Sequence, residues 1–438
     1  MGQEKPARMV VISNGFNKFH MAVAAAEAQR RGILSSFITG AYPTPGIRWV
    51  SRMMGLSRNQ KFARLIARGE AINDQSIEPA WCAESLYNFA WTARRITPQF
   101  AKMLEVTSFR IYGRQAVRPV MEAARDGARI YHYRAGFGGD SVKVAAQLGM
   151  VTLCDYSIAH AAVLFRLIEN GGVLSGAALT PQLSRLWLDI LADTEQADFV
   201  LVNSDFVKNT FLEQGWDAAR LEVIYLGVDD AFLEVVPTSR PNFVQTDPLR
   251  LMFAGGFERR KGAETVIATL SLLHDVRWTL EIAGVLDADA NIDQDFLKDP
   301  RISVTGWLPR TELARRMAAA EVFVFPSLAE GSARVVFEAL AAGMYVITTP
   351  NAGSIVQDGV HGRLIAPGDP RGLADAIREA AKNRVELAAI GLRNAELVRS
   401  RYRQSDYGDA LAGLYSRLLA DRSNAQRCSA SPSTSAAI

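Results

Sequence analysis

Short apolar runs and longer amphipathic stretches alternate along most of the chain. The first run, 8–16, predicts a buried strand that turns into a helix ending near Gly32, and a second strand is expected at 34–40. This order of strand, helix and strand opens a parallel, doubly wound sheet, in which ligands bind at the carboxyl ends of the strands. Further strands of this half are expected at 128–134, 150–156, 197–204 and 221–227.

A second series of the same kind begins at residue 249. Its strands are expected at 249–257, 278–284, 302–308, 322–327 and 345–349, and its helices at 261–275, 311–320 and 332–342. The segment between the two series, 229–248, loses periodicity and gains proline and aspartate, which is typical of a linker. The sequence therefore predicts an α/β protein with a Rossmann-like domain over 1–228 and another over 249–400.

The last part of the chain has a different pattern. Residues 401–421 have an amphipathic pattern, which predicts a helix. Residues 422–438 are small and polar and have little to bury, so we expect a disordered tail there.

Composition narrows the classes of function. The 438 residues are 49% hydrophobic and 22% charged, which allows two buried cores. The formal net charge of +3 is small for this length and argues against a dedicated nucleic-acid binder. The three cysteines have no metal-binding spacing, and no signal peptide or run of about 18 apolar residues is present. We therefore expect a cytoplasmic protein with reduced thiols.

Two glutamates eight positions apart, Glu330 and Glu338, lie in front of a predicted helix and inside it. The carboxylate of Glu330 can only accept hydrogen bonds, which suits sugar hydroxyls. Glu338 lies on an apolar helix face and needs a partner, such as the diol of a ribose. Alternatively, Glu330 caps the helix and Glu338 is solvated or bonded to a neighbouring strand.

The start of this helix, expected near Ser332, is suited to an anion. Gly331 lets the backbone approach a ligand, and free amides at a helix N-terminus favour a phosphate. The amides concerned belong to Ser332, Ala333 and Arg334.

A basic cluster lies at another predicted strand end, in the segment 254–262. Arg259, Arg260 and Lys261 follow two glycines that permit close approach. Cations at this position would stabilise the negative charge that develops on a leaving diphosphate. The alternative is a solvated basic turn that caps a helix.

Four segments, in this order, resemble the retaining, nucleotide-sugar-dependent glycosyltransferases of family 4, which have the GT-B fold. The resemblance is strong over 195–400 and weak over 8–160. It implies two Rossmann-like domains that face a cleft and a C-terminal helix that crosses back. The segments are 195–229, 304–327, 326–349 with the E-x7-E pattern, and 358–370.

The resemblance assigns roles in the second domain. It implies that Glu330 contacts the transferred sugar, that Glu338 contacts the ribose and that Lys261 binds phosphate. The position of the family's partner arginine is Gly256 here, which leaves Arg259 or Arg260 as its replacement. The base would be recognised in the loop of Trp307 and Leu308, and the usual later Pro-Glu pair is replaced by Gly353 and Ser354.

The first domain supplies further candidates. The family's double-glycine loop is represented by Gly15 alone, and His20 begins the next helix. Strand ends place four more polar side chains where ligands bind in doubly wound sheets. These are His132, Arg134, Asp155 and His160, of which we favour Arg134 and His160 for contacts to the acceptor or the donor sugar.

The function implied by the resemblance is that of a retaining, hexosyltransferase-like enzyme. It would move a sugar from a nucleotide-diphosphate sugar to a glycan or lipid-linked acceptor, in surface polysaccharide or glycolipid synthesis. Since cations and the helix end would take up the developing charge, no metal or other cofactor is expected. The alternatives are another GT-B enzyme, such as a sugar-nucleotide epimerase or a phosphorylase, and a non-catalytic protein that binds nucleotide sugars.

One segment outside these motifs, 46–69, carries six cations and no acid, with large apolar side chains between them. Such a stretch can lie on an anionic membrane surface or guide an anionic acceptor. In that case the protein would be peripheral on the inner face of the cell membrane. The alternative is an ordinary pair of helices with solvated cations.

Overall fold

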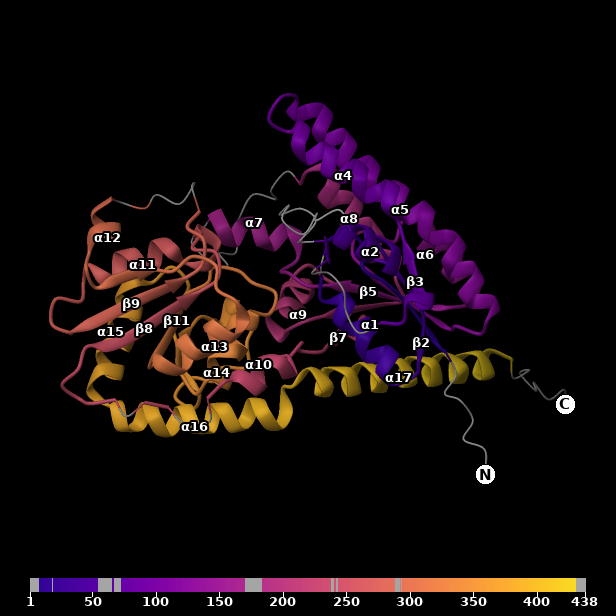
Figure 1. Ribbon diagram of the computed structural model, residues 1–438. Helices are drawn as coiled ribbons and strands as arrows, with labels where there is room; N and C mark the ends of the chain where they lie inside the picture. The colour runs from indigo at the N-terminus through magenta and orange to yellow at the C-terminus, as the bar shows by residue number, and fades with distance from the viewer. Residues whose placement is uncertain are drawn as a thin grey trace, which may run out of the picture. The chain divides into compact units, whose positions relative to one another are not determined.

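The computed structural model describes residues 8–17, 19–53, 65–66, 72–169, 183–237, 240–241, 243–287, 292 and 294–430. The chain divides into two compact units. Unit 1 comprises Met1–Tyr156, Leu183–Leu201 and Gly408–Ile438, and unit 2 comprises Ser157–Gln182 and Val202–Tyr407. Figure 1 shows the elements of both units along the chain.

The elements that begin in unit 1 follow the predicted order, with one further strand, β3, between the second predicted strand and the third. They are β1 (Val10–Ser13), α1 (Met21–Arg30), β2 (Leu34–Thr39), α2 (Pro45–Met53), η2 (Asp74–Ser76), β3 (Ile77–Pro79), α4 (Trp81–Ala93), α5 (Pro98–Arg125), β4 (Ile130–Arg134), α6 (Asp140–Gln147), β5 (Val151–Tyr156), α8 (Arg185–Glu195) and β6 (Phe199–Val202).

The elements that begin in unit 2 alternate strand and helix. They are α7 (Ala161–Glu169), α9 (Asp205–Leu212), η3 (Ala218–Arg220), β7 (Leu221–Val223), α10 (Asp230–Val235), β8 (Leu249–Ala254), η4 (Arg259–Lys261), α11 (Ala263–Leu270), β9 (Trp278–Ala283), α12 (Gln294–Lys298), β10 (Ile302–Val304), α13 (Arg310–Ala319), β11 (Val322–Phe325), α14 (Arg334–Ala341), β12 (Tyr345–Thr348), η5 (Pro350–Ala352), β13 (Gly362–Leu364), α15 (Pro370–Lys382), α16 (Arg384–Arg401) and α17 (Gln404–Ala430).

The strands form two sheets, a seven-stranded one in the order β3-β2-β1-β4-β5-β6-β7 and a six-stranded one in the order β10-β9-β8-β11-β12-β13. β1 pairs in parallel with β2 and β4, and β8 pairs in parallel with β9 and β11. In each sheet the order reverses where the chain returns to the other side of the first strand, as in a doubly wound sheet. The two parallel Rossmann-like sheets confirm the predicted fold class.

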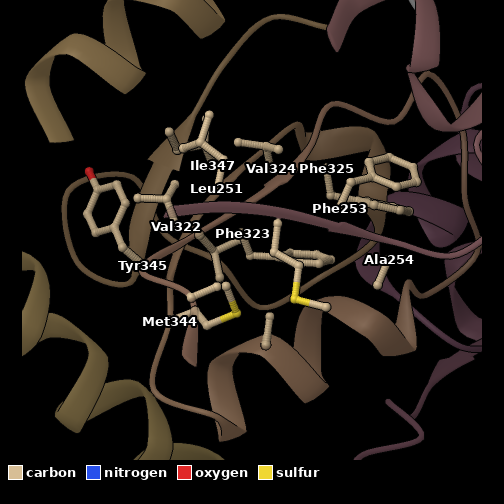
Figure 2. Close-up of a cluster of buried hydrophobic side chains, with 14 of the residues drawn as sticks. Leu251, Phe253, Ala254, Val322, Phe323, Val324, Phe325, Met344, Tyr345 and Ile347 are labelled. Carbon is tan, nitrogen blue, oxygen red and sulfur yellow. The ribbon is translucent and has the colours of Figure 1, made fainter. Parts of the chain in front are cut away.

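The core of unit 2 explains why its strand β11 is an unbroken apolar run. Strands that are buried on both faces cannot alternate polar and apolar residues. In β11, Val322, Phe323, Val324 and Phe325 are all at most 1% exposed. Figure 2 shows these side chains with those of β8 and β12 in one buried cluster.

Two boundaries differ from the predictions. The expected linker 229–248 contains α10, because Phe232 and Leu233 are buried in the core of unit 2. The last helix, α17, extends to Ala430 and not only to 421, so part of the expected tail is helical. Leu411, Leu414 and Leu418 are each 1% exposed, which holds the first part of α17 in place.

The basic segment 46–69 lies largely outside the described residues. Its first part belongs to α2, where Trp49 and Met53 are 64% and 70% exposed. Within the described ranges, no helix combines the length and the apolar character that crossing a membrane requires.

Candidate functional site

The candidate site in unit 2 forms where two neighbouring strands end. β8 continues through Gly255 into η4, and β11 continues through residues 326–333 into α14. β8 and β11 pair in parallel, so their carboxyl ends lie at the same edge of the sheet. The basic cluster and the first glutamate of the E-x7-E pattern therefore meet, although about 70 residues separate them in the sequence.

Arg260 is the cation closest to Glu330. Its Nη1 lies 2.7 Å from Glu330 Oε1 and donates a hydrogen bond to the carbonyl of Ala329 at 3.0 Å. Its Nη2 donates to Glu258 Oε1 at 2.7 Å. Glu330 Oε1 is buried and accepts no well-aligned hydrogen bond from the described residues, so its contact with Arg260 is electrostatic. Three partners thus fix the guanidinium beside the carboxylate.

Lys261 completes the cluster, with its Nζ 3.9 Å from Glu330 Oε1. Gly255 leaves room for this side chain, because a Cβ at Gly255 would lie 3.1 Å from the Lys261 Nζ. Gly262 is required for a different reason. Its φ is +85°, and a Cβ there would lie 2.1 Å from the carbonyl oxygen of Pro326. The turn that carries Lys261 is therefore pressed against the loop that carries Glu330.

Gly331 makes a close approach, but to the protein itself. A Cβ at this position would lie 1.8 Å from the carbonyl oxygen of Ser157 and 2.8 Å from Asn203 Nδ2. The hydroxyl of Ser204 also donates to the carbonyl of Gly331. The side of Gly331 that lacks a Cβ therefore faces the polypeptide and not an open ligand space.

The helix after Glu330 begins later than predicted. Ala333 is the N-cap residue and α14 starts at Arg334, so the predicted start near Ser332 is wrong. The amide of Ala333 donates to the carbonyl of Ala352 at 3.0 Å and is not free to bind a phosphate. Ser332 Oγ is buried and lacks a hydrogen-bond partner within the described residues. The loop before α14 is therefore held by hydrogen bonds to Ala352 and Ser204 and does not depend on a ligand.

Glu338 is bonded to an arginine from the adjacent helix. Its Oε1 accepts from Arg310 Nη2 at 2.7 Å, and Arg310 Nη1 lies 2.6 Å from Asp229 Oδ2. Burial raises the pKa of Glu338, against the opposing attraction of Arg310 and Arg334. Asp229 also lies 3.6 Å from Arg334 and caps α10 through Phe232. Glu338 is thus bonded through one oxygen to Arg310 of helix α13, and not to a residue of a neighbouring strand.

The remaining candidates in unit 2 lie away from this cluster or at its edge. Arg259 is 3.7 Å from Glu264 and its side chain is 54% exposed. Gly256 has open space where a Cβ would stand, apart from the Glu258 Cδ at 4.0 Å. Trp307 is 76% exposed, while Leu308 packs against the core.

His160 also belongs to unit 2. Its backbone carbonyl accepts from Val163 and Leu164 at the start of α7, and its ring packs edge-on against Phe211 with 4.9 Å between centroids. Nδ1 is buried without a hydrogen-bond partner in the described part of the chain. Burial, together with the charge of Arg166, lowers the pKa of His160 to about 4. At neutral pH the ring is therefore uncharged.

The candidates of unit 1 gather around Asp155, at the carboxyl end of β5. His20 Nε2 lies 2.8 Å from Asp155 Oδ1, and His132 Nε2 lies 3.6 Å from Oδ2. His132 Nδ1 in turn bonds the hydroxyl of Tyr415 on α17 at 2.7 Å. Burial alone would raise the pKa of Asp155, but attraction to His20 and smaller contributions from His132 hold it well below its ordinary value.

Arg134 and Gly15 lie in the same unit. The Arg134 guanidinium stands 3.7 Å from the centroid of Phe19 and donates to the carbonyl of Phe16 at 3.3 Å. Burial lowers the pKa of Arg134 to about 10, with Asp155 opposing the shift. Gly15 has a φ of +76°, and a Cβ there would meet Phe137 at 2.6 Å. Arg134 belongs to unit 1 and His160 to unit 2.

Sequence reasoning missed the residues that hold the candidates in place. Glu258 pairs with Arg260, Arg310 with Glu338 and Asp229 with Arg334, and each of these partners was singled out from the sequence. Glu258 stands two positions from Arg260 and could have been included with the basic cluster. Arg310 and Asp229 lie far from Glu338 along the chain, and no local pattern connects them.

No group of three or more histidine, cysteine, aspartate or glutamate side chains that could hold a metal ion is found among the residues the structure describes.

Part of the second half of the chain matches a known protein family. Residues 248–383 match the family model described as Glycosyl transferases group 1. The matched segment contains the cluster of Arg260, Lys261 and Glu330, as well as Glu338 and the loop of Trp307.

The fold of the whole chain is the GT-B fold. The structure of Anabaena Alr3699/HepE in complex with UDP matches with a TM-score of 0.58, covering 93% of this chain and 100% of that one, at 14% identity. At this identity the likeness concerns the fold alone.

Curated relatives match part of the sequence. D-inositol 3-phosphate glycosyltransferase of Nocardioides sp. is 28% identical over 46% of this chain and 51% of its own length. Lipopolysaccharide core biosynthesis glycosyltransferase LpsE of Rhizobium meliloti is 25% identical over 51% of this chain and 65% of its own length. The chain spans about half the length of the curated relatives it matches.

Proposed function

We propose that the chain is a glycosyltransferase that moves a sugar from a nucleotide-diphosphate sugar to a glycan or lipid-linked acceptor. The observation that carries the proposal is the convergence of Lys261 and Arg260 on Glu330 at adjacent strand ends of unit 2. It pairs anion-binding cations with a hydrogen-bond acceptor, as a charged diphosphate joined to a sugar requires. The match of residues 248–383 to Glycosyl transferases group 1 supports the same assignment.

The roles divide by chemistry. Lys261 and Arg260 bind the diphosphate, and Glu330 accepts hydrogen bonds from the hydroxyls of the transferred sugar. Arg310 engages one oxygen of Glu338, which leaves the second oxygen for the ribose diol. Arg260 is held by Glu258 and Ala329, so it need not be ordered when substrate binds.

The reaction follows from these roles. The bond between the anomeric carbon and the diphosphate oxygen breaks, and the leaving nucleoside diphosphate keeps the electron pair. Lys261 and Arg260 neutralise the charge that builds on it, which makes a metal ion unnecessary in this proposal. The acceptor hydroxyl adds to the same face of the sugar, with retention, and its proton passes to the oxygen of the leaving diphosphate. His160, His20 and Arg134 are proposed to contact the acceptor or the donor sugar.

Two comparisons suggest where to look for substrates. The Anabaena structure contains UDP, so a UDP-sugar is the first donor to test. The relative from Rhizobium meliloti is named for lipopolysaccharide core synthesis, which supports a glycan or lipid-linked acceptor in surface polysaccharide or glycolipid synthesis. Such an enzyme would work in the cytoplasm, at the inner face of the cell membrane.

Mass spectrometry tests the proposal. The protein is incubated with UDP-, GDP- and ADP-sugars, with and without glycan and lipid-linked acceptors. We expect one donor to yield a glycosylated acceptor and free nucleoside diphosphate, in the presence of EDTA as well as without it. Conversion of a nucleotide sugar with no acceptor would identify an epimerase, and a phosphorylase would require phosphate and a bound pyridoxal cofactor. Binding without turnover of any donor would favour a non-catalytic protein.

A further inference from the structure

The tip of the α4–α5 hairpin, residues 89–103, exposes an unusual set of side chains. The two helices lie side by side in unit 1 (Figure 1). Five large apolar residues of this hairpin tip are exposed to solvent: Phe89 (59%), Trp91 (62%), Ile96 (85%), Phe100 (47%) and Met103 (55%). Single exposed apolar residues are common, but five large ones within 15 residues favour contact with another molecule.

The buried positions of the hairpin tip are small. Ala90 on α4 and Ala101 on α5 are 2% and 1% exposed and line one small cavity, together with part of Trp91. Alanine lets helix backbones pack closely but buries little apolar surface. The large apolar side chains of the hairpin tip therefore remain mostly in contact with solvent, and an apolar partner would cover them.

The charge of the hairpin tip limits what that partner can be. Between Glu84 and Glu105 the sequence has no acid and three cations, Arg94, Arg95 and Lys102. Arg94 pairs with Glu105 at 2.9 Å. Arg95 and Lys102 are exposed and have no carboxylate partner in the part of the chain that the structure describes. The partner must therefore accept both apolar side chains and positive charge.

We propose that the hairpin tip docks on an anionic lipid surface. Tryptophan and phenylalanine insert at the level of the headgroups, where an aromatic ring finds an apolar medium, and the cations pair with lipid phosphates. A second copy of this chain fits less well, because a two-fold contact would bring the same cations together. The contact is superficial, since the described helices are too polar or too short to cross a bilayer.

This docking surface is distinct from the segment 46–69 and does not depend on the proposed transfer reaction. It gives the chain a way to reach a lipid-linked molecule from the surface of a bilayer. Lipid binding can be measured without any donor or acceptor, so its failure and the failure of the transferase proposal are separate results.

Vesicle sedimentation of the full chain tests the proposal. Phosphatidylcholine vesicles are compared with vesicles that also contain phosphatidylglycerol. We expect binding to the anionic vesicles, a loss of tenfold or more in Trp91→Glu and Ile96→Glu, and a loss of about fivefold for each of Arg95→Gln and Lys102→Gln. All four positions are exposed, so the variants should fold.

Val385→Glu is the matched control, because Val385 is 87% exposed in unit 2 and lies outside the hairpin tip. It should bind like the unmodified chain. Unchanged vesicle binding in Trp91→Glu and Ile96→Glu would overturn the proposal, as would absence of binding by the unmodified chain. A fall in oligomer mass on substitution at Trp91 or Ile96, measured by sedimentation without lipid, would assign the hairpin tip to self-association instead.

Discussion

Arg259 and Arg260 are adjacent in the sequence, but their guanidinium groups have different surroundings. Arg260 is 27% exposed and lies 2.7 Å from Glu330, whereas Arg259 is 54% exposed and faces Glu264. The sequence left open which of them replaces the arginine expected at Gly256. The direction of each side chain decides which arginine lies beside Glu330. A sequence of consecutive cations does not show these directions.

We predict that Arg260→Ala lowers kcat/KM for sugar transfer about 100-fold to 1,000-fold, because the leaving diphosphate loses a fixed positive charge. Arg259→Ala should change it by about twofold at most, since exposed ion pairs contribute little. Steady-state kinetics with the donor found by mass spectrometry provide the measurement. Equal losses in the two variants would show that the structure assigns the wrong arginine.

The lowered pKa of His160 leads us to predict that the stability of the chain depends on pH. Its pKa is lowered to about 4 in the folded chain, against about 6.5 in an unfolded one. Between these values the unfolded chain binds a proton that the folded chain does not, so stability is lost as pH falls from about 6.5 toward 4. From pH 7.5 to pH 5 this loss is about 2 kcal/mol.

The His160→Phe variant should lack this loss, since phenylalanine does not titrate and can pack against Phe211. Urea unfolding of both chains at the two pH values gives the comparison. At pH 7.5 the variant should be close to the unmodified chain in stability, because Nδ1 has no hydrogen bond to lose within the described residues. The same pH dependence in both chains would contradict the assigned protonation.

At the scale of elements, the strands around the site were predictable and the loops between them were not. β11 and β12 are buried along their length, and β8 is buried except at Arg250, so hydrophobicity located all three. The start of α14 was placed too early because the Ala333 amide bonds Ala352 in a loop far along the chain. β3 and β13 have three residues each and were not predicted. β7 and β10 are as short, but they lie in the longer apolar segments 221–227 and 302–308.

Gly262 joins η4 to α11 and offers a test of this local geometry. We predict that Gly262→Ala costs about 3 kcal/mol or more of stability, from left-handed backbone strain together with a clash with Pro326. Gly359→Ala is the control, since its φ is +71° but no atom lies within 4 Å of the added Cβ. It should cost about 1–2 kcal/mol from strain alone.

Urea unfolding of the two glycine variants separates the terms. The difference between them measures how tightly the Lys261 turn is pressed against the loop that carries Glu330. Similar losses in both variants would mean that the Pro326 contact relaxes freely, and the site would then be less rigid than described.

At the scale of the whole molecule, two parallel sheets could be predicted because each half repeats the order of strand and helix. The local pattern alone did not show how the chain divides into units. The resemblance implied a C-terminal helix that crosses back, and residues from Gly408 onward belong to unit 1, although unit 2 directly precedes them. Tyr415 and His132 form a buried hydrogen bond across almost 300 positions, and no local pattern records such a pairing. The helix α10 lies where composition suggested only a linker.

The central claim is that one cluster in unit 2 binds both the diphosphate and the sugar of the donor. Calorimetric titration of a nucleotide sugar and of the matching nucleoside diphosphate tests it most directly. Lys261→Met should weaken both ligands about tenfold to 100-fold, because each contains the phosphates. Glu330→Gln should weaken the nucleotide sugar and leave the nucleoside diphosphate within about threefold, because only the former has the sugar hydroxyls. Unchanged affinity of both ligands in both variants would contradict the account.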